Sequence, residues 1–384
     1  MHYLDHCGST PVAPEVESTI IEFVKSGNFG NPSAAHHAAG SRAFELVETC
    51  RESIARDLGA KPSQIIFTSG ASEANNLLLW GFALRYRARG CHILFGATEH
   101  KSIFDTATAL TDLEGVTSSC IPVNSNGTAD LNHLELALQG LQNKSVLVAL
   151  MHINNEVPVR HPVEEISKIC RKYGAFFHCD GVQGFVREPL DFSQGLFGSY
   201  VLSSHKIYGL KGFGVLVLGD GLLSTRISPP YHGGGHERGM RPGTLNTLAI
   251  AAGATSISLH NKKRKERLAH MNSCAKAFID RLQRELPEMR LTLPMNDLAV
   301  GIINFYVPGI DAPTLLAAMP DICINRGASC IGSGGETFSH VPKALGFPIE
   351  IQANVLRASF GEAISVQGSQ AAAVLISQRT KNLR

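Results

Sequence analysis

The sequence lacks the features that mark several large classes of protein. Its nine cysteines include no pair separated by two residues, which argues against a structural zinc site and against a disulfide framework. Residues 1–11 lack a basic start followed by a long apolar stretch, and apolar runs such as residues 146–151 are far shorter than a membrane span. We therefore expect a cytoplasmic protein with reduced thiols, no metal site and no membrane contact.

Charge is also scarce. The formal net charge is +2, and charged residues make up 18% of the chain. The one dense basic run, residues 262–267, lies at the start of a helical pattern, where a solvated helix face is the ordinary interpretation. These observations predict no direct nucleic-acid binding.

What the chain does contain is the composition of a globular enzyme. It has 384 residues, 44% of them apolar, and no long biased tract, so two domains are expected. Strand-like runs occur at residues 65–68, 92–95, 146–151, 175–179, 200–203 and 214–218. Together with helical spacing over 41–58 and 72–85, this alternation predicts an α/β large domain, residues 13–255, with a mostly parallel sheet.

The pattern of apolar residues changes near residue 250. An apolar stripe with helical spacing ends at Pro287, and short strands are expected at 300–307 and 355–360. The simplest account is a smaller α+β domain, residues 256–384, joined by the N-terminal segment 1–12.

Two polar positions follow buried strand-like runs. Lys206 comes just past the run at 200–203, where α/β enzymes bind ligands, and could form a Schiff base with a carbonyl cofactor. Asp180 ends the preceding run, and a pyridoxal-phosphate (PLP) site needs a carboxylate at the pyridine nitrogen, because a ring that keeps its proton is an electron sink. Gln183 could bond the ring oxygen or merely begin a helix. Taken alone, a lysine at a strand end is usually a surface charge.

Two further stretches could complete such a site. Residues 68–73 pass from strand to helix and can offer backbone N–H groups and the Ser72 hydroxyl to a phosphate. His100 follows another strand-like run, where its ring could stack on a flat cofactor and move protons near neutral pH. In isolation, such turns are common in α/β folds, and a histidine at the position of His100 is more often an ordinary polar loop residue.

Six motifs together resemble those of the cysteine desulfurases, which are PLP enzymes of fold type I related to the class V aminotransferases. The motifs are TSGASEANN (68–76), TEHKS (98–102), MHINNE (151–156), HCDGVQ (178–183), SSHKIYGLKGFG (203–214) and GGGHERGMRPGTLN (233–246). They occur in that family's order and at its spacing. The stretches YLDHCGSTPVAPEV and GNPSAAHHAAG also look like that family, so the resemblance covers nearly the whole chain.

The resemblance implies PLP as the cofactor, with Lys206 as the Schiff-base lysine. Asp180 would face the ring nitrogen, Gln183 the ring oxygen and His100 the ring face. The residues implied to hold the phosphate are Ser72, Ser203, His205 and, from the neighbouring subunit, Thr244. The active unit would then be a homodimer, with Lys206 and His100 as its proton carriers.

The resemblance also implies the substrate and the nucleophile. L-cysteine would be held by Arg357, whose planar fork suits an α-carboxylate, with help from Asn155. Cys330, within RGASCIGSGG, would attack the substrate's sulfur and carry it as a persulfide, leaving alanine. Cys179 and Cys323 are expected to be structural, and strand alternation turns Cys179 away from the presumed site.

The spacing from Cys330 to Arg357 resembles the long-loop branch of the family, the housekeeping and nitrogen-fixation type. This chain departs from that branch in GASC where GSAC is usual, in Ser72 for threonine and in a tail that ends soon after Arg379. The short tail leaves the sulfur-acceptor protein open: iron–sulfur cluster assembly, DNA phosphorothioation, tRNA thiolation or a sulfur-containing metabolite. The alternatives are a selenocysteine lyase or an aminotransferase, which the cysteine at position 330 disfavours, and a non-catalytic scaffold, which the presence of Lys206, Asp180 and Cys330 disfavours.

Overall fold

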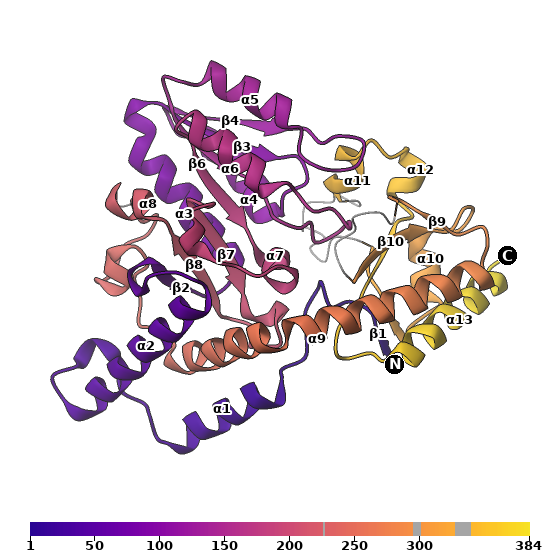
Figure 1. Ribbon diagram of the computed structural model, residues 1–384, viewed down its shortest axis with the longest axis horizontal. Helices are drawn as coiled ribbons and strands as arrows, with labels where there is room; N and C mark the ends of the chain where they lie inside the picture. The colour runs from indigo at the N-terminus through magenta and orange to yellow at the C-terminus, as the bar shows by residue number, and fades with distance from the viewer. Residues whose placement is uncertain (226, 295–300, 327–338) are drawn as a thin grey trace.

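Seven strands form the main sheet of the protein, in the order β2-β8-β7-β6-β5-β3-β4 (Figure 1). The computed structural model to which this sheet belongs describes residues 1–225, 227–294, 301–326 and 339–384. The strands are β2 (Ile65–Thr68), β3 (Cys91–Gly96), β4 (Val116–Ile121), β5 (Ser145–Ala149), β6 (Phe176–Asp180), β7 (Ser199–Ser203) and β8 (Gly214–Leu218). Strands β3 to β7 run parallel, and β8 is antiparallel to both of its neighbours. The predicted mostly parallel α/β sheet is therefore confirmed.

Alternating side chains along the strands fill two cores, one on each face of the sheet. In β5, Val146 and Val148 belong to one core, and Leu147 and Ala149 belong to the other. The first face is covered by α2 (Ala38–Asp57), α5 (Leu131–Gly140), α6 (Val163–Lys172) and α7 (Val182–Arg187), and the second by α3 (Ala71–Tyr86), α4 (Lys101–Ala109) and α8 (Asp220–Thr225). Because both faces are buried, the strands read as continuous apolar runs.

A smaller α+β part contains an antiparallel sheet of order β12-β10-β9. Its strands are β9 (Arg290–Leu291), β10 (Ile302–Tyr306) and β12 (Leu356–Ser359), and its helices include α10 (Ala312–Ala317), α11 (His340–Ala344) and α12 (Ile349–Gln352). Strand β1 (His2–Tyr3) pairs in parallel with β11 (Ile322–Cys323), so the N-terminal segment lies against this part. The domain limits at residues 12 and 255 stay predictions.

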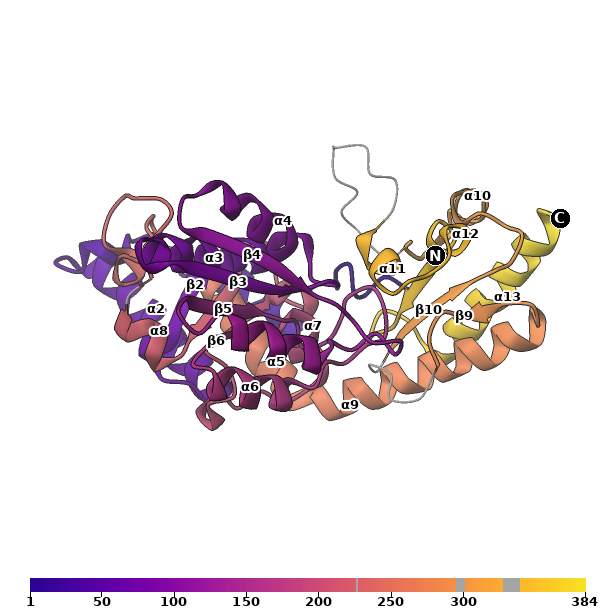
Figure 2. The same ribbon diagram turned by 90° about the horizontal axis from the view of Figure 1, so that it is seen from above.

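The long helix α9 (Thr247–Glu285) connects the two parts. Figures 1 and 2 show it running from beneath the large sheet to the smaller one, and it packs against α1 (Pro14–Lys25), α2 and α13 (Val366–Asn382). Gly253 permits close packing here, because a Cβ at this position would lie 2.1 Å from the Phe213 ring. Among the helices of the described ranges, none combines the length and apolar character that a membrane crossing requires.

The prediction of a solvated basic face at residues 262–267 is wrong in part. Arg264 is 9% exposed and Arg267 is 2% exposed. Arg267 donates from Nε and Nη2 to the two carboxylate oxygens of Glu362, each at 3.1 Å, and its guanidinium lies 4.2 Å from the centre of the Tyr208 ring. The run lies in the middle of α9, where segments distant in sequence cover two of its cations.

Candidate active site

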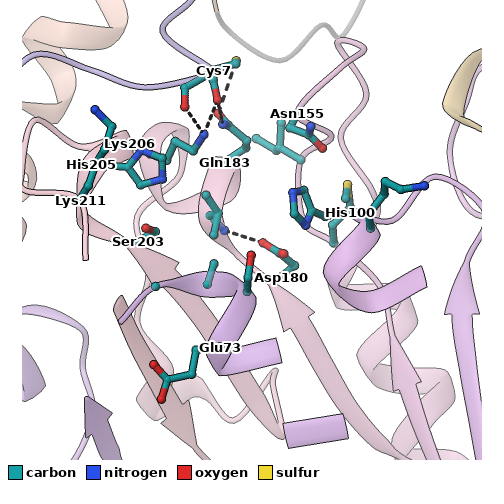
Figure 3. Close-up of a pocket in the computed structure, with 18 of the residues that line it drawn as sticks. Cys7, Glu73, His100, Asn155, Asp180, Gln183, Ser203, His205, Lys206 and Lys211 are labelled. Atoms are coloured by element: carbon teal, nitrogen blue, oxygen red, sulfur yellow. Dashed lines mark hydrogen bonds between the residues drawn. The ribbon is translucent and has the colours of Figure 1, made fainter. Parts of the chain in front are cut away.

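A cavity of about 420 Å³ lies at the carboxyl ends of the parallel strands (Figure 3). Strand β6 ends at Asp180 and β7 ends at Ser203, so the sheet itself positions both side chains. The predicted site residues that line the cavity are Ser72, His100, Asn155, Asp180, Gln183, Ser203, His205 and Lys206. The structure thus brings together residues from five of the six sequence motifs around one space.

Lys206 points into this cavity from the turn that follows β7 (Figure 3). Its Nζ donates hydrogen bonds to the backbone oxygens of Cys7 and Gly8, each at 2.6 Å. The N-terminal segment therefore forms part of the wall and holds the amine with two carbonyl dipoles. These contacts stabilise the ammonium form of the lysine.

Asp180 lies in the cavity wall with 7% of its surface exposed. Its Oδ2 accepts from Asn75 Nδ2 at 2.9 Å, and its Oδ1 accepts from the Val182 N–H at 3.1 Å. A carboxylate oxygen can accept more than one hydrogen bond, so Asp180 keeps lone pairs for a further N–H donor. A protonated pyridine nitrogen is such a donor.

His100 is the N-cap of α4 and lines the cavity. Its Nδ1 accepts from the Ser102 N–H at 3.1 Å and lies 2.8 Å from Ser102 Oγ. Burial lowers the pKa of His100, an effect that Asp180 opposes and Lys206 reinforces. The neutral ring, with Nδ1 as acceptor, carries its proton on Nε2.

The first turn of α3 and the turn after β7 form a polar cradle at the cavity. Ser72 lies in the first turn of a helix of 16 residues, whose leading N–H groups have no partner within the helix. Burial lowers the pKa of His205 to about 4, with further lowering by Lys206 and Lys211. His205 is therefore neutral near pH 7, and its Nδ1 lies 3.3 Å from Ser9 Oγ. Hydroxyl, imidazole and helix N-terminus together suit a phosphate.

Gln183 is held by two residues to which the sequence assigns no role. Arg187 Nη1 donates to Gln183 Oε1 at 2.7 Å, and because a guanidinium only donates, this contact fixes which end of the amide is oxygen. The other end, Nε2, lies 3.3 Å from the Cys7 backbone oxygen. The Cys7 thiol lies 3.6 Å from Gln183 Oε1 and 3.6 Å from Arg187 Nη2. The contacts of Cys7 with Gln183 and Arg187 join positions about 180 apart in sequence, so no local spacing indicates them.

Three predicted residues lie elsewhere. Arg357 and Thr244 are described but lie outside the cavity lining, and Cys330 lies outside the described residues. Arg357 is 1% exposed, donates from Nη2 to Asp5 Oδ1 at 2.5 Å and from Nη1 to the Asn155 backbone oxygen at 2.6 Å. Its Nε has no partner among the described residues. Arg357 therefore lies directly behind Asn155 and keeps its buried Nε donor for a further partner. Thr244 is exposed.

Most of the described cysteines are buried thiols. Cys179 is 0% exposed, as its strand position predicts, and burial raises its pKa well above the usual value. Burial also raises the pKa of Cys91 and of Cys170 to about 12. Such thiols stay protonated near pH 7 and are poor nucleophiles.

Comparison with known proteins agrees with this site. The aminotransferase class-V family model matches residues 2–369. Cysteine desulfurase IscS of Rickettsia bellii is 34% identical over 382 residues, which cover 100% of this chain and 92% of that protein. A solved NifS-like protein superposes with a TM-score of 0.89 at 27% identity, covering 100% of both chains. The structure of SspA in complex with cysteine has a TM-score of 0.79 at 28% identity and covers 94% of this chain and 99% of that one.

The fold and the site define a PLP-dependent enzyme of the aminotransferase class-V family, to which the chain belongs. Within that family it is a cysteine desulfurase. The residues present fit the cofactor, since the cavity offers a lysine for its carbonyl, a carboxylate for its ring nitrogen and a polar cradle for its phosphate.

Proposed function

We propose that this chain uses Lys206, His100 and Cys330 to move sulfur from L-cysteine to an acceptor protein. The observation that carries the proposal is the meeting of Lys206, Asp180 and His100 in one cavity, each delivered by a different element of the large sheet. Asp180 and Gln183 would hold the ring of PLP, and Ser72, Ser203 and His205 its phosphate.

When bound, PLP supplies the electron sink that allows the α-carbon of the substrate to lose a proton. Lys206 Nζ takes that proton, and the two backbone oxygens at 2.6 Å stabilise the resulting ammonium. His100 presents its Nε2 proton from the opposite wall and returns a proton to the substrate. Both groups act in a buried space, where electrostatic effects are stronger than in water.

Sulfur capture falls to Cys330. As thiolate it forms a bond to the sulfur of the substrate while the bond between that sulfur and carbon breaks, and the bonding electrons stay with the carbon skeleton that becomes alanine. The product on the enzyme is a persulfide. Substrate would be oriented by its carboxylate, with Arg357 as the cation behind Asn155. The Arg357 Nε, for which the described residues offer no hydrogen-bond partner, supports this role.

The fate of the sulfur and the assembly belong to the same proposal. We infer a homodimer in which Thr244 reaches the phosphate of the partner's cofactor, supported by its exposed position before α9. The cytoplasm is the compartment that suits a chain with eight described free cysteines. Iron–sulfur cluster assembly, DNA phosphorothioation, tRNA thiolation and a sulfur-containing metabolite are the candidate destinations.

The test is to incubate the purified protein with L-cysteine and a thiol reductant and to follow sulfide and alanine together. We expect equal amounts from the wild type and a loss of more than about 100-fold in Cys330→Ser, because the persulfide cannot form. Cys120→Ser, which changes an exposed thiol away from the cavity, should leave both products unchanged. Undiminished alanine from Cys330→Ser would instead favour lyase chemistry without a protein persulfide.

Cys7 provides an internal comparison, because it is a second cysteine at the cavity, and its thiol lies 3.6 Å from Gln183 Oε1. If Cys7→Ser, and not Cys330→Ser, abolished sulfide and alanine, the sulfur acceptor would be the thiol of the N-terminal segment. The same pair of variants, trapped with an alkylating agent and examined by mass spectrometry, would show which cysteine gains a sulfur atom.

A further inference from the structure

Asn75 is the centre of a buried hydrogen-bond network beside the cavity. Its side chain is 0% exposed and belongs to α3. Nδ2 lies 2.9 Å from Asp180 Oδ2 and 2.9 Å from Ser102 Oγ, and Oδ1 lies 3.0 Å from His178 Nε2. One amide thus uses both of its donors and its acceptor to join α3, α4 and β6.

The chemistry of its partners fixes the orientation of this amide. The Asp180 carboxylate only accepts hydrogen bonds, so the NH₂ end of Asn75 must face it. The oxygen then faces His178 Nε2, which must carry a proton, while His178 Nδ1 accepts from Ser199 Oγ at 2.9 Å. Burial lowers the pKa of His178 to about 3, which keeps that ring neutral and this arrangement unchanged near pH 7.

The second amide hydrogen determines the state of His100. Because Ser102 Oγ accepts from Asn75, its own proton is free to point at His100 Nδ1, 2.8 Å away. The Ser102 N–H donates to the same nitrogen at 3.1 Å. A proton on Nδ1 would face two donors, so the ring exchanges protons through Nε2 alone.

We propose that Asn75 is a positioning residue that couples Asp180 to His100, so that a single amide orients the carboxylate and, together with the Ser102 N–H, sets the tautomer of the imidazole. This inference rests on the roles proposed above for those two residues. Without the amide, Asp180 loses one donor, and the Ser102 hydroxyl can turn and accept a proton from His100 Nδ1. The orientation of the Asp180 carboxylate and the tautomer of His100 would then change together.

The experiment compares two variants. Asn75→Leu replaces the amide with a side chain of similar volume, and Ser102→Ala removes only the hydroxyl that links Asn75 to His100. The dissociation constant of PLP is measured by titrating the full-length apo protein, and the His100 tautomer by ¹⁵N NMR of histidine-labelled apo protein, assigned with His100→Gln. We expect Asn75→Leu to weaken PLP binding about tenfold, as for one lost bond to a charged group, and to mix the His100 tautomers. Ser102→Ala should alter the His100 nitrogen shifts while PLP binding changes less than about twofold.

A folded Asn75→Leu protein with wild-type PLP affinity and an unchanged His100 tautomer would overturn the inference. If the leucine variant does not fold, Asn75→Ala removes the same three contacts without added branching and decides in its place. Asp180→Asn separates this inference from the proposed function. Unchanged PLP affinity in Asp180→Asn would mean that the cofactor role of Asp180 is wrong. If PLP affinity is weakened in Asp180→Asn but is that of the wild type in Asn75→Leu, only the coupling is contradicted.

Discussion

Lys206 depends on the N-terminal segment of the chain, because the backbone oxygens of Cys7 and Gly8 hold its amine. Lys211 lines the same cavity but is exposed, so it offers a matched comparison. We expect Lys206→Ala to lose the visible absorbance band that PLP gives when bound to its lysine, and Lys211→Ala to keep that band. Absorbance spectra of the two purified variants, with PLP added and excess removed, test this assignment; a retained band in Lys206→Ala would contradict it.

At the scale of single residues, the sequence predicts the side chains that follow a strand and fails for those held by distant contacts. Asp180 and Ser203 are the last residues of β6 and β7, and His100 follows β3 by four residues, so strand ends place them at one edge of the sheet. Asn75 acts through partners on other elements, and Arg187, besides its local bond to Gln183, contacts the distant Cys7 thiol. Nothing in their local pattern distinguishes them from ordinary helix residues.

At the scale of elements, prediction succeeds where both faces of a strand are buried. The sequence gives β2 and β8 their observed ends, because each is a continuous buried run between turn residues. The edge strand β4 is not predicted from the sequence, because its middle residues are mostly polar and at least partly exposed and so form no apolar run. The start of α9 at Thr247 likewise lies within a region that reads as a domain border, and only its tertiary packing shows one continuous helix.

Buried histidines hold connections between elements, so we expect the unfolding free energy to fall at acidic pH. His161 Nδ1 accepts from the Ala129 N–H at 3.1 Å and so ties the segment before α6 to the segment before α5. Burial lowers the pKa of His161 to about 4 from 6.5. Between these two pH values His161 binds a proton in the unfolded chain but not in the folded chain. The contribution of His161 to stability is therefore full above pH 6.5 and is lost as the pH falls towards 4.

At pH 5 this single group should cost at most about 2 kcal/mol of unfolding free energy relative to pH 7. Urea unfolding at the two pH values measures the difference. We expect His161→Gln to reduce the loss of stability between pH 7 and pH 5, and His133→Gln, at an exposed position of α5, to leave it as in the wild type. Equal losses in all three proteins would show that His161 does not contribute.

At the scale of the whole molecule, the site lies where the two parts of the chain meet. Arg357 belongs to β12 of the smaller part, yet it contacts the Asp5 side chain and the backbone of Asn155 beside the cavity. The N-terminal segment pairs with β11 and also holds Lys206. A change in the relative position of the two parts would therefore alter at once the contacts of Arg357 and of Lys206, the residues proposed to bind the substrate and the cofactor.

The largest scale is that of the proposed dimer, and Thr244 allows the dimer to be tested through activity. The residue is exposed and lies outside the cavity of its own chain, so we expect it to complete the partner's site. Lys206→Ala and Thr244→Ala should each be impaired at limiting PLP. When the two are unfolded together and refolded as a mixture, each mixed dimer has one site with both residues intact. Random pairing makes half of the dimers mixed, so recovery of about a quarter of wild-type desulfuration is expected. Separate refolding of each variant is the control; no recovery in the mixture, with mixed dimers present by mass spectrometry, would place Thr244 in its own subunit's chemistry or in none.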